Sequence, residues 1–131
     1  AGVRNLGAIV RQYGGDNVVV VVSAMGKTTN ALEDVVKAFF AGQTNVAFER
    51  WEAVKQYHLD ILAGLGIGYG AIDDLWHDLE QCLNKPASGT FDSVYDQIVS
   101  VGELMSTRIV SVYLAQLDID VRWLDARQLI R

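Results

Sequence analysis

Five consecutive valines, Val18 to Val22, restrict most strongly how this chain of 131 residues can fold. A strand with one solvent-exposed face alternates apolar and polar residues, so an unbroken β-branched run predicts a strand covered on both faces, as in a parallel sheet. A second short strand is predicted at Val121 to Leu124, after a turn at residues 118–120. Because two strands do not form a stable sheet alone, we expect neighbouring strands outside this chain and a longer parent protein.

Almost all of the sequence between the two predicted strands is helical in pattern. Apolar residues at helical spacing predict helices over 3–13, 30–42, 46–65, 72–83 and 91–117. Asn30 and Glu33 have the spacing of a capping box and predict the start of the second helix, whereas Gly102 predicts a break or a kink in the last one. The fold class predicted is α/β, mostly helical, with two buried parallel strands.

Composition excludes several classes of protein. Half of the residues are hydrophobic, which is enough for a packed core, and eleven basic against sixteen acidic residues give a net charge of −5. A net negative chain without a basic stripe is a poor candidate for nucleic-acid binding. The longest apolar run, five residues, is far shorter than a membrane span. A single cysteine, Cys82, indicates a reducing compartment.

Ser23 to Asn30, with the sequence SAMGKTTN, is the segment most indicative of ligand binding. It joins the end of the predicted first strand to the start of a helix, where free amides and a partial positive charge favour phosphates and carboxylates. The alternative is a plain strand-to-helix connection with a capping cluster. A nucleotide P-loop is excluded, because that motif requires a second glycine where this chain has Val21.

Two further segments each allow a structural and a functional interpretation. Ser100 and Glu103 match a capping box in spacing, and Glu103 could instead present a carboxylate to a cationic ligand group. Asp125 and Arg127 follow the second predicted strand and either bind ligand or pair with each other; the structural role is favoured. A dedicated metal site is not predicted, because His77 and Cys82 do not share a helix face and His58 lies on an apolar one.

Three stretches resemble aspartate kinases. They are Val18 to Asn30 (VVVVVSAMGKTTN), Asp96 to Ser106 (DQIVSVGELMS, with a Gly-Glu pair at Gly102 and Glu103) and Trp123 to Arg131 (WLDARQLIR). The resemblance implies that residues 1–131 are part of an amino-acid kinase catalytic domain, a three-layer αβα sandwich of the carbamate kinase-like type. Residues 43–90 would be a variable helical region within it.

The resemblance also implies a reaction and a site. The parent enzyme would transfer the γ-phosphoryl group of Mg-ATP to the β-carboxylate of L-aspartate, giving 4-phospho-L-aspartate, the first step towards lysine, threonine and methionine. Ser23 and Thr29 would hold aspartate near the phosphate acceptor position, and Glu103 would bind its α-ammonium group. The parent would be a cytoplasmic homo-oligomer whose substrates are L-aspartate and ATP, with Mg²⁺.

Parts of the family pattern have no match in this chain. These are the opening Lys-Phe-Gly-Gly-Thr-Ser loop with its phosphate-stabilising lysine, the ATP-binding half and the regulatory ACT domains. We therefore expect the fragment to bind no cofactor and to be inactive alone. Two alternatives stay open: another amino-acid kinase, such as one acting on glutamate, and a non-catalytic helical interaction module.

Overall fold

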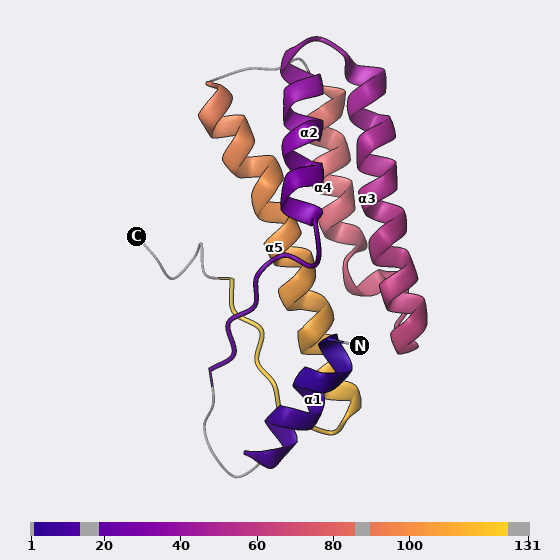
Figure 1. Cartoon of the computed structure of the whole chain (residues 1–131), viewed down its shortest axis with the longest axis vertical. Helices are drawn as coiled ribbons and strands as arrows, with labels where there is room; N and C mark the ends of the chain where they lie inside the picture. Colours follow the sequence, from indigo (N-terminus) through magenta and orange to yellow (C-terminus); the bar gives the residue numbers. More distant parts are fainter. Residues whose placement is uncertain (1, 14–18, 86–89, 126–131) are drawn as a thin grey trace.

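The computed structural model describes residues 2–13, 19–85 and 90–125 and is built from helices. Figure 1 shows the helices after the first one running alongside one another, with the N-terminal helix, α1, beside one end of the last helix. The elements are α1 (Gly2–Gln12), α2 (Thr28–Phe40), α3 (Thr44–Leu65), the single 3₁₀ turn η1 (Tyr69–Ala71), α4 (Asp73–Asn84) and α5 (Phe91–Gln116).

The predicted helices are confirmed, and two of their ends have a clear local cause. Helix α3 ends at Gly66, which adopts the left-handed conformation (φ 71°) that favours glycine at this position. Helix α5 begins at Thr90, whose hydroxyl oxygen accepts a hydrogen bond from the Ser93 amide over 3.1 Å. Helix α2 packs against α3 and α5, and α4 packs against the same two helices. The core between them includes the fully buried side chains of Leu32, Val35, Val36, Trp51, Leu62, Met105 and Ile109.

The two buried parallel strands are not present in the part of the chain that the structure describes. Residues 19–25 and 119–125 have no strand assignment, and Val19 and Val21 are each 90% exposed to solvent. A β-strand requires a hydrogen-bonded neighbour, and the described residues supply none for either segment. The prediction of burial on both faces is therefore wrong for this chain by itself.

The predicted start of the second helix is wrong, and so is the predicted break at Gly102, the kink having been the other possibility there. Helix α2 begins at Thr28, before the predicted cap Asn30, and Lys27 at its N-cap position makes no side-chain capping bond. Glu33 accepts a hydrogen bond from the Tyr95 hydroxyl instead, over 2.6 Å. Helix α5 continues through Gly102 without a break, because its apolar residues on both sides of the glycine pack into one core.

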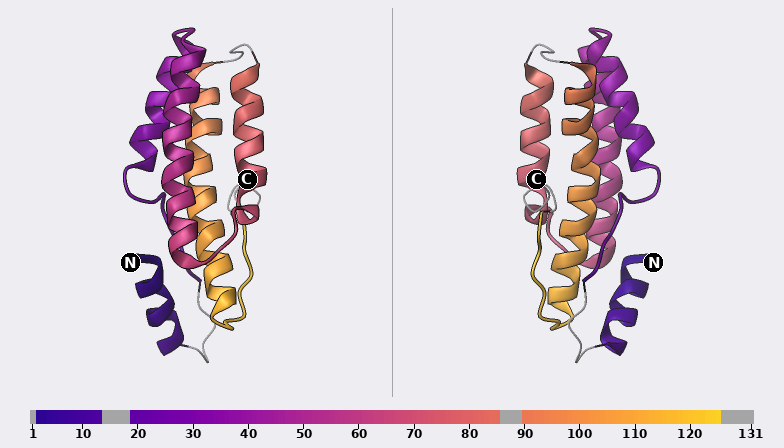
Figure 2. Two further views of the ribbon diagram at one scale, coloured as in Figure 1. Left: turned by 90° about the vertical axis from the view of Figure 1, so that its right-hand side faces the viewer. Right: turned by 90° about the vertical axis from the view of Figure 1, so that its left-hand side faces the viewer.

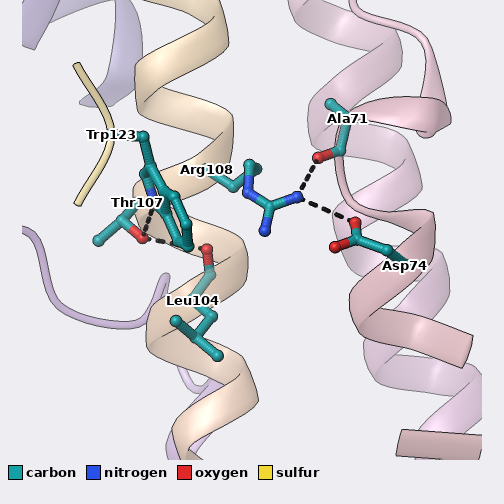
Figure 3. Close-up of polar contacts among 6 residues, drawn as sticks. All are labelled: Ala71, Asp74, Leu104, Thr107, Arg108 and Trp123. Atoms are coloured by element: carbon teal, nitrogen blue, oxygen red, sulfur yellow. Dashed lines mark hydrogen bonds and ion pairs between the residues drawn. The ribbon is translucent and has the colours of Figure 1, made fainter. Parts of the chain in front are cut away.

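Trp123 and Arg108 anchor the C-terminal segment to the helices (Figure 3). The Trp123 indole donates to the Thr107 hydroxyl over 3.0 Å, and the Arg108 guanidinium lies 4.5 Å from the centre of the Trp123 ring. The same guanidinium donates to the Ala71 carbonyl and to Asp74. These contacts tie residues 119–125, α5 and the start of α4 together.

Helix α5 has the length and composition of a membrane span, and it is the only helix of the described ranges that has both. Half of its most apolar window is buried within the protein, and Figure 2 shows it lying among the other helices. Its apolar character is therefore accounted for by its place in the core.

His58 is fully buried on α3, and its position predicts a dependence of stability on pH. Its Nδ1 lies 2.8 Å from the Val54 carbonyl, so it donates there, while Nε2 is buried with no described partner. Desolvation lowers the pKa of His58 below its usual 6.5. Because the unfolded chain takes up this proton first, stability is complete above about pH 6.5 and falls as the pH decreases below it.

Replacing His58 by Leu should remove this contribution to acid sensitivity. Urea unfolding between pH 7.5 and 5 is expected to show a steeper loss of stability in the original chain, by at most about 1.4 kcal/mol per pH unit. His77→Gln, which removes an exposed imidazole, is the control and should keep the original slope. Identical slopes for the original chain and His58→Leu would contradict the assignment.

Candidate functional site

The SAMGKTTN segment forms the approach to α2 and its first turn. The amide of Thr28 donates to the Met25 carbonyl over 3.1 Å, and the amide of Ala31 donates to the Lys27 carbonyl over 3.0 Å. Between them, the amides of Thr29 and Asn30 have no acceptor among the residues that the structure places. The first turn of α2 therefore presents unpaired N–H groups at the positive end of a helix dipole, a site that suits a carboxylate or a phosphate.

Gly26 shapes this segment through its backbone. Its φ of 55° lies in the left-handed region, and the Tyr57 hydroxyl of α3 would lie only 2.5 Å from a Cβ atom at this position. Any side chain at residue 26 would therefore meet both backbone strain and a steric clash. The sequence alone did not indicate that Tyr57 lies against Gly26.

Gly102 lets α5 approach the same segment from another side. A Cβ atom at Gly102 would lie 3.0 Å from Leu32 Cδ1, 3.1 Å from Thr28 Cγ2 and 3.4 Å from Ala24 Cβ. The absence of a side chain at residue 102 thus permits direct packing of α5 on the start of α2. This contact joins two of the three sequence stretches on which the resemblance rests, which are far apart in the chain.

The three predicted substrate-binding residues lie on these two segments. Ser23 precedes the Gly26 turn, Thr29 is in the first turn of α2, and Glu103 follows Gly102 on α5. All three side chains are exposed, and none makes a hydrogen bond or ion pair with a described residue. Their polar atoms are therefore available to a ligand, whereas their joint contact with one substrate remains a prediction.

The capping interpretation of Ser100 and Glu103 is wrong. Both residues lie inside α5, where the Ser100 hydroxyl donates to the Gln97 carbonyl over 3.2 Å and Glu103 has no capping bond. A capping box needs the unpaired amides of a helix start, which the middle of a continuous helix lacks. Of the two roles weighed for Glu103, only the presentation of a carboxylate to a ligand stays open.

The sequence groups the Thr28 hydroxyl with those of Ser23 and Thr29 as possible ligand contacts, but the structure buries Thr28. It is 3% exposed, it packs against Gly102, and its hydroxyl oxygen has no described hydrogen-bond partner. The two threonines of the segment therefore differ: the Thr28 side chain is buried in the protein, and the Thr29 side chain is exposed to solvent. Leu32 and Val35 follow Thr28 by one and two turns on the same face of α2. Because both are apolar, they mark this face as the buried one.

The remaining polar candidates do not extend this region. Asp125 is buried, and Arg127, its predicted partner, lies outside the described residues. Burial raises the pKa of the Cys82 thiol, which disfavours the nucleophilic thiolate. Among the residues that the structure describes, no group of three or more His, Cys, Asp or Glu side chains is arranged to hold a metal ion.

Two hollows in the described surface lie away from these residues. A shallow groove of about 720 Å³ is bordered by Lys55, Tyr69 and Glu80, and a second hollow of about 390 Å³ lies between α4 and α5 near Leu79 and Val101. Neither includes Ser23, Thr29 or Glu103. The candidate residues are instead exposed at the surface where α5 packs on the start of α2.

Comparison with known proteins supports the family indicated by these segments. The model of the amino acid kinase family matches residues 2–131. The chain is 32% identical over 126 residues to the bifunctional aspartokinase/homoserine dehydrogenase 2 of Escherichia coli, covering 94% of the chain and 15% of that protein. It is 36% identical over 123 residues to the chloroplastic aspartokinase 2 of Arabidopsis thaliana, covering 90% of the chain and 22% of that protein.

A third relative, the lysine-sensitive aspartokinase 3 of Escherichia coli, is 28% identical over 116 residues, which are 86% of the chain and 25% of that protein. The chain thus spans between about a seventh and a quarter of the length of these relatives. With a family model that matches almost every residue, and aspartokinases as its relatives, the chain belongs to the amino acid kinase family.

Proposed function

We propose that this chain is the amino-acid-binding part of an aspartokinase, in which Ser23, Thr29 and Glu103 contact L-aspartate. The reaction would transfer the γ-phosphoryl group of Mg-ATP to the β-carboxylate and give 4-phospho-L-aspartate. The observation that carries the proposal is the packing of Gly102 against Ala24 and Thr28, which joins the two segments that contain these residues. The similarity to aspartokinases supports the same substrate.

The charges at this junction suit a zwitterionic amino acid. Glu103 offers a carboxylate for an ammonium group, and the unpaired amides of Thr29 and Asn30 offer donors for a carboxylate. Ser23 and Thr29 add hydroxyl groups that can donate and accept hydrogen bonds. The two segments that pack together through Gly102 thus carry, between them, a group for each charged end of aspartate.

The strands and the Mg-ATP site belong to the proposed complete domain. Val19, Val21 and Leu124 are exposed apolar residues, which suits segments that pair with further strands of an αβα sandwich. The described residues include no cluster able to hold a metal ion, so the proposal assigns Mg-ATP to no residue here. A cytoplasmic homo-oligomer acting in lysine, threonine and methionine synthesis would be the corresponding parent protein.

A hybrid enzyme tests the proposal directly. In it, this chain replaces the aligned 126 residues of the bifunctional aspartokinase/homoserine dehydrogenase 2 of Escherichia coli. The hybrid is expected to phosphorylate aspartate but not glutamate, and the dehydrogenase activity of the same polypeptide reports whether it has folded. A hybrid with dehydrogenase activity but no aspartate kinase activity would contradict the proposal, and one that prefers glutamate would indicate another amino-acid kinase.

The chain by itself is expected to show no turnover with Mg-ATP and aspartate. Phosphoryl transfer requires positioned charge around the phosphate groups, and the phosphate-stabilising lysine loop of the family has no match in this sequence. A coupled assay of ADP release measures this, with the hybrid enzyme as the positive control. Aspartate-dependent turnover by the chain at ordinary kinase rates, about 1–100 per second, would show that the phosphate-binding machinery is present after all.

A further inference from the structure

Tyr57 makes a contact that reaches from the helical region of residues 43–90 to the candidate site. It lies on α3, and its hydroxyl oxygen would be 2.5 Å, and its Cζ atom 3.3 Å, from a Cβ atom at Gly26. The ring is 45% exposed, and its hydroxyl has no hydrogen-bond partner among the residues placed by the structure. The ring also meets that of the neighbouring His58 edge-on, with centroids 5.4 Å apart. Its hydroxyl, which no described hydrogen bond holds, lies over the Gly26 turn.

The segment between Ser23 and Thr29 is thus contacted from two sides. Tyr57 of α3 covers Gly26, and Gly102 of α5 contacts Ala24 and Thr28. Gly26 has a positive φ and forms the least restricted part of the segment, because glycine has more backbone freedom than any other residue. A ring placed against the glycine removes part of that freedom and fixes the path of the chain towards α2.

We propose that Tyr57 is a positioning residue for the aspartate site: its side chain holds the Gly26 turn and so fixes the relative positions of Ser23 and Thr29. This inference rests on the proposed function. It gives the helical region of residues 43–90 a role in substrate binding, and it requires no contact between Tyr57 and the substrate. Both the ring and the hydroxyl of Tyr57 lie against Gly26. Phenylalanine at residue 57 should therefore still hold the Gly26 turn in most of its position.

Kinetics of the hybrid enzyme separate positioning from general structural support. Tyr57→Ala is expected to raise the KM for aspartate about tenfold, because small displacements of binding groups are costly, while the KM for ATP and the dehydrogenase activity stay within about twofold. Tyr57→Phe should restore the KM for aspartate to within about threefold of the original. Tyr69→Ala, which removes an exposed tyrosine at η1, is the matched control and should leave both constants unchanged.

Failure of this inference is distinguishable from failure of the proposed function. If Glu103→Gln raises the KM for aspartate in the hybrid and Tyr57→Ala does not, the site stands and the positioning role is overturned. If the hybrid lacks kinase activity, the proposed function fails. NMR of the original chain then tests whether Tyr57 holds the Gly26 turn. Tyr57→Ala should then change the Gly26 resonances and accelerate hydrogen exchange at residues 24–29; unchanged resonances and exchange would overturn it.

A double-mutant cycle tests the same contact by a different route. Gly26→Ala introduces a methyl group towards the Tyr57 hydroxyl and also imposes backbone strain at a positive φ. The backbone strain is the same whether residue 57 is tyrosine or phenylalanine. The double-mutant cycle therefore isolates the clash with the hydroxyl group. Gly26→Ala should lower the Tm less in Tyr57→Phe than in the original chain, and equal decreases would contradict the close approach.

Discussion

Gly102→Val should reduce kcat/KM for aspartate in the hybrid enzyme by about a hundredfold or more. A Cβ atom at residue 102 would lie only 3.0–3.4 Å from atoms of Leu32, Thr28 and Ala24. Valine would add two methyl groups beyond this atom. Overpacking of this kind costs about 1–3 kcal/mol and is relieved by moving backbone. The backbone that moves carries Glu103 away from Thr29, and a misplacement of about 1 Å is enough for a hundredfold loss.

Gly102→Ala and a glycine in an open position provide the matched comparison. Alanine at residue 102 needs only a shift of a few tenths of an ångström in its neighbours, and it improves helix propensity by about 1 kcal/mol. Its stability should therefore stay close to that of the original, with an intermediate loss of aspartate affinity. A Cβ atom at Gly64 on α3 would have no atom within 4 Å, so Gly64→Val should leave the kinetics unchanged.

Steady-state kinetics with each substrate varied in turn, together with thermal unfolding, measure these effects. The specific expectation is a rise in the KM for aspartate that follows the size of the side chain at residue 102, from glycine to alanine to valine. A Gly102→Val hybrid with an unchanged KM for aspartate would show that the approach of α5 to α2 is not part of the site.

The sequence predicted the helices well because their signals are local. The apolar spacing of α3, the glycine that ends it and the single continuous apolar pattern of α5 depend on residues close together in the chain. The prediction of strands failed because strand formation depends on residues that are not close in the chain. Val19 and Val21 have strong β propensity, but a strand exists only through its neighbours, and none is present among the residues described.

The candidate site was predictable in its segments and not in its contacts. The Gly-Glu pair and the SAMGKTTN segment are recognisable in the sequence, but the capping-box spacing of Ser100 and Glu103 occurs equally inside a helix, where it has no meaning. The role of Gly102 as a contact surface, and the position of Tyr57 over Gly26, depend on how three helices pack. No local pattern contains that information.

Glu103→Gln should lower kcat/KM for aspartate in the hybrid enzyme by about ten- to a hundredfold. Gln is nearly isosteric with Glu and keeps an oxygen acceptor, so the substitution removes mainly the negative charge that would pair with the ammonium group of aspartate. Hydrogen bonds to charged groups are about twice as strong as those between neutral groups. The effect should appear largely in the KM for aspartate, while the KM for ATP stays unchanged because the proposal places no ATP contact at Glu103.

A loss of protein stability is not expected to contribute to this result. Glu103 lies in the middle of α5, exposed and without a described partner, so Gln there should change stability by less than about 0.5 kcal/mol. Asp96→Asn is the matched control, because Asp96 is an exposed carboxylate on the same helix, seven residues or two turns away. If both variants reduce aspartate affinity equally, the loss reflects the net charge of α5. If neither does, Glu103 is a surface residue, and the ammonium-binding role proposed for it is wrong.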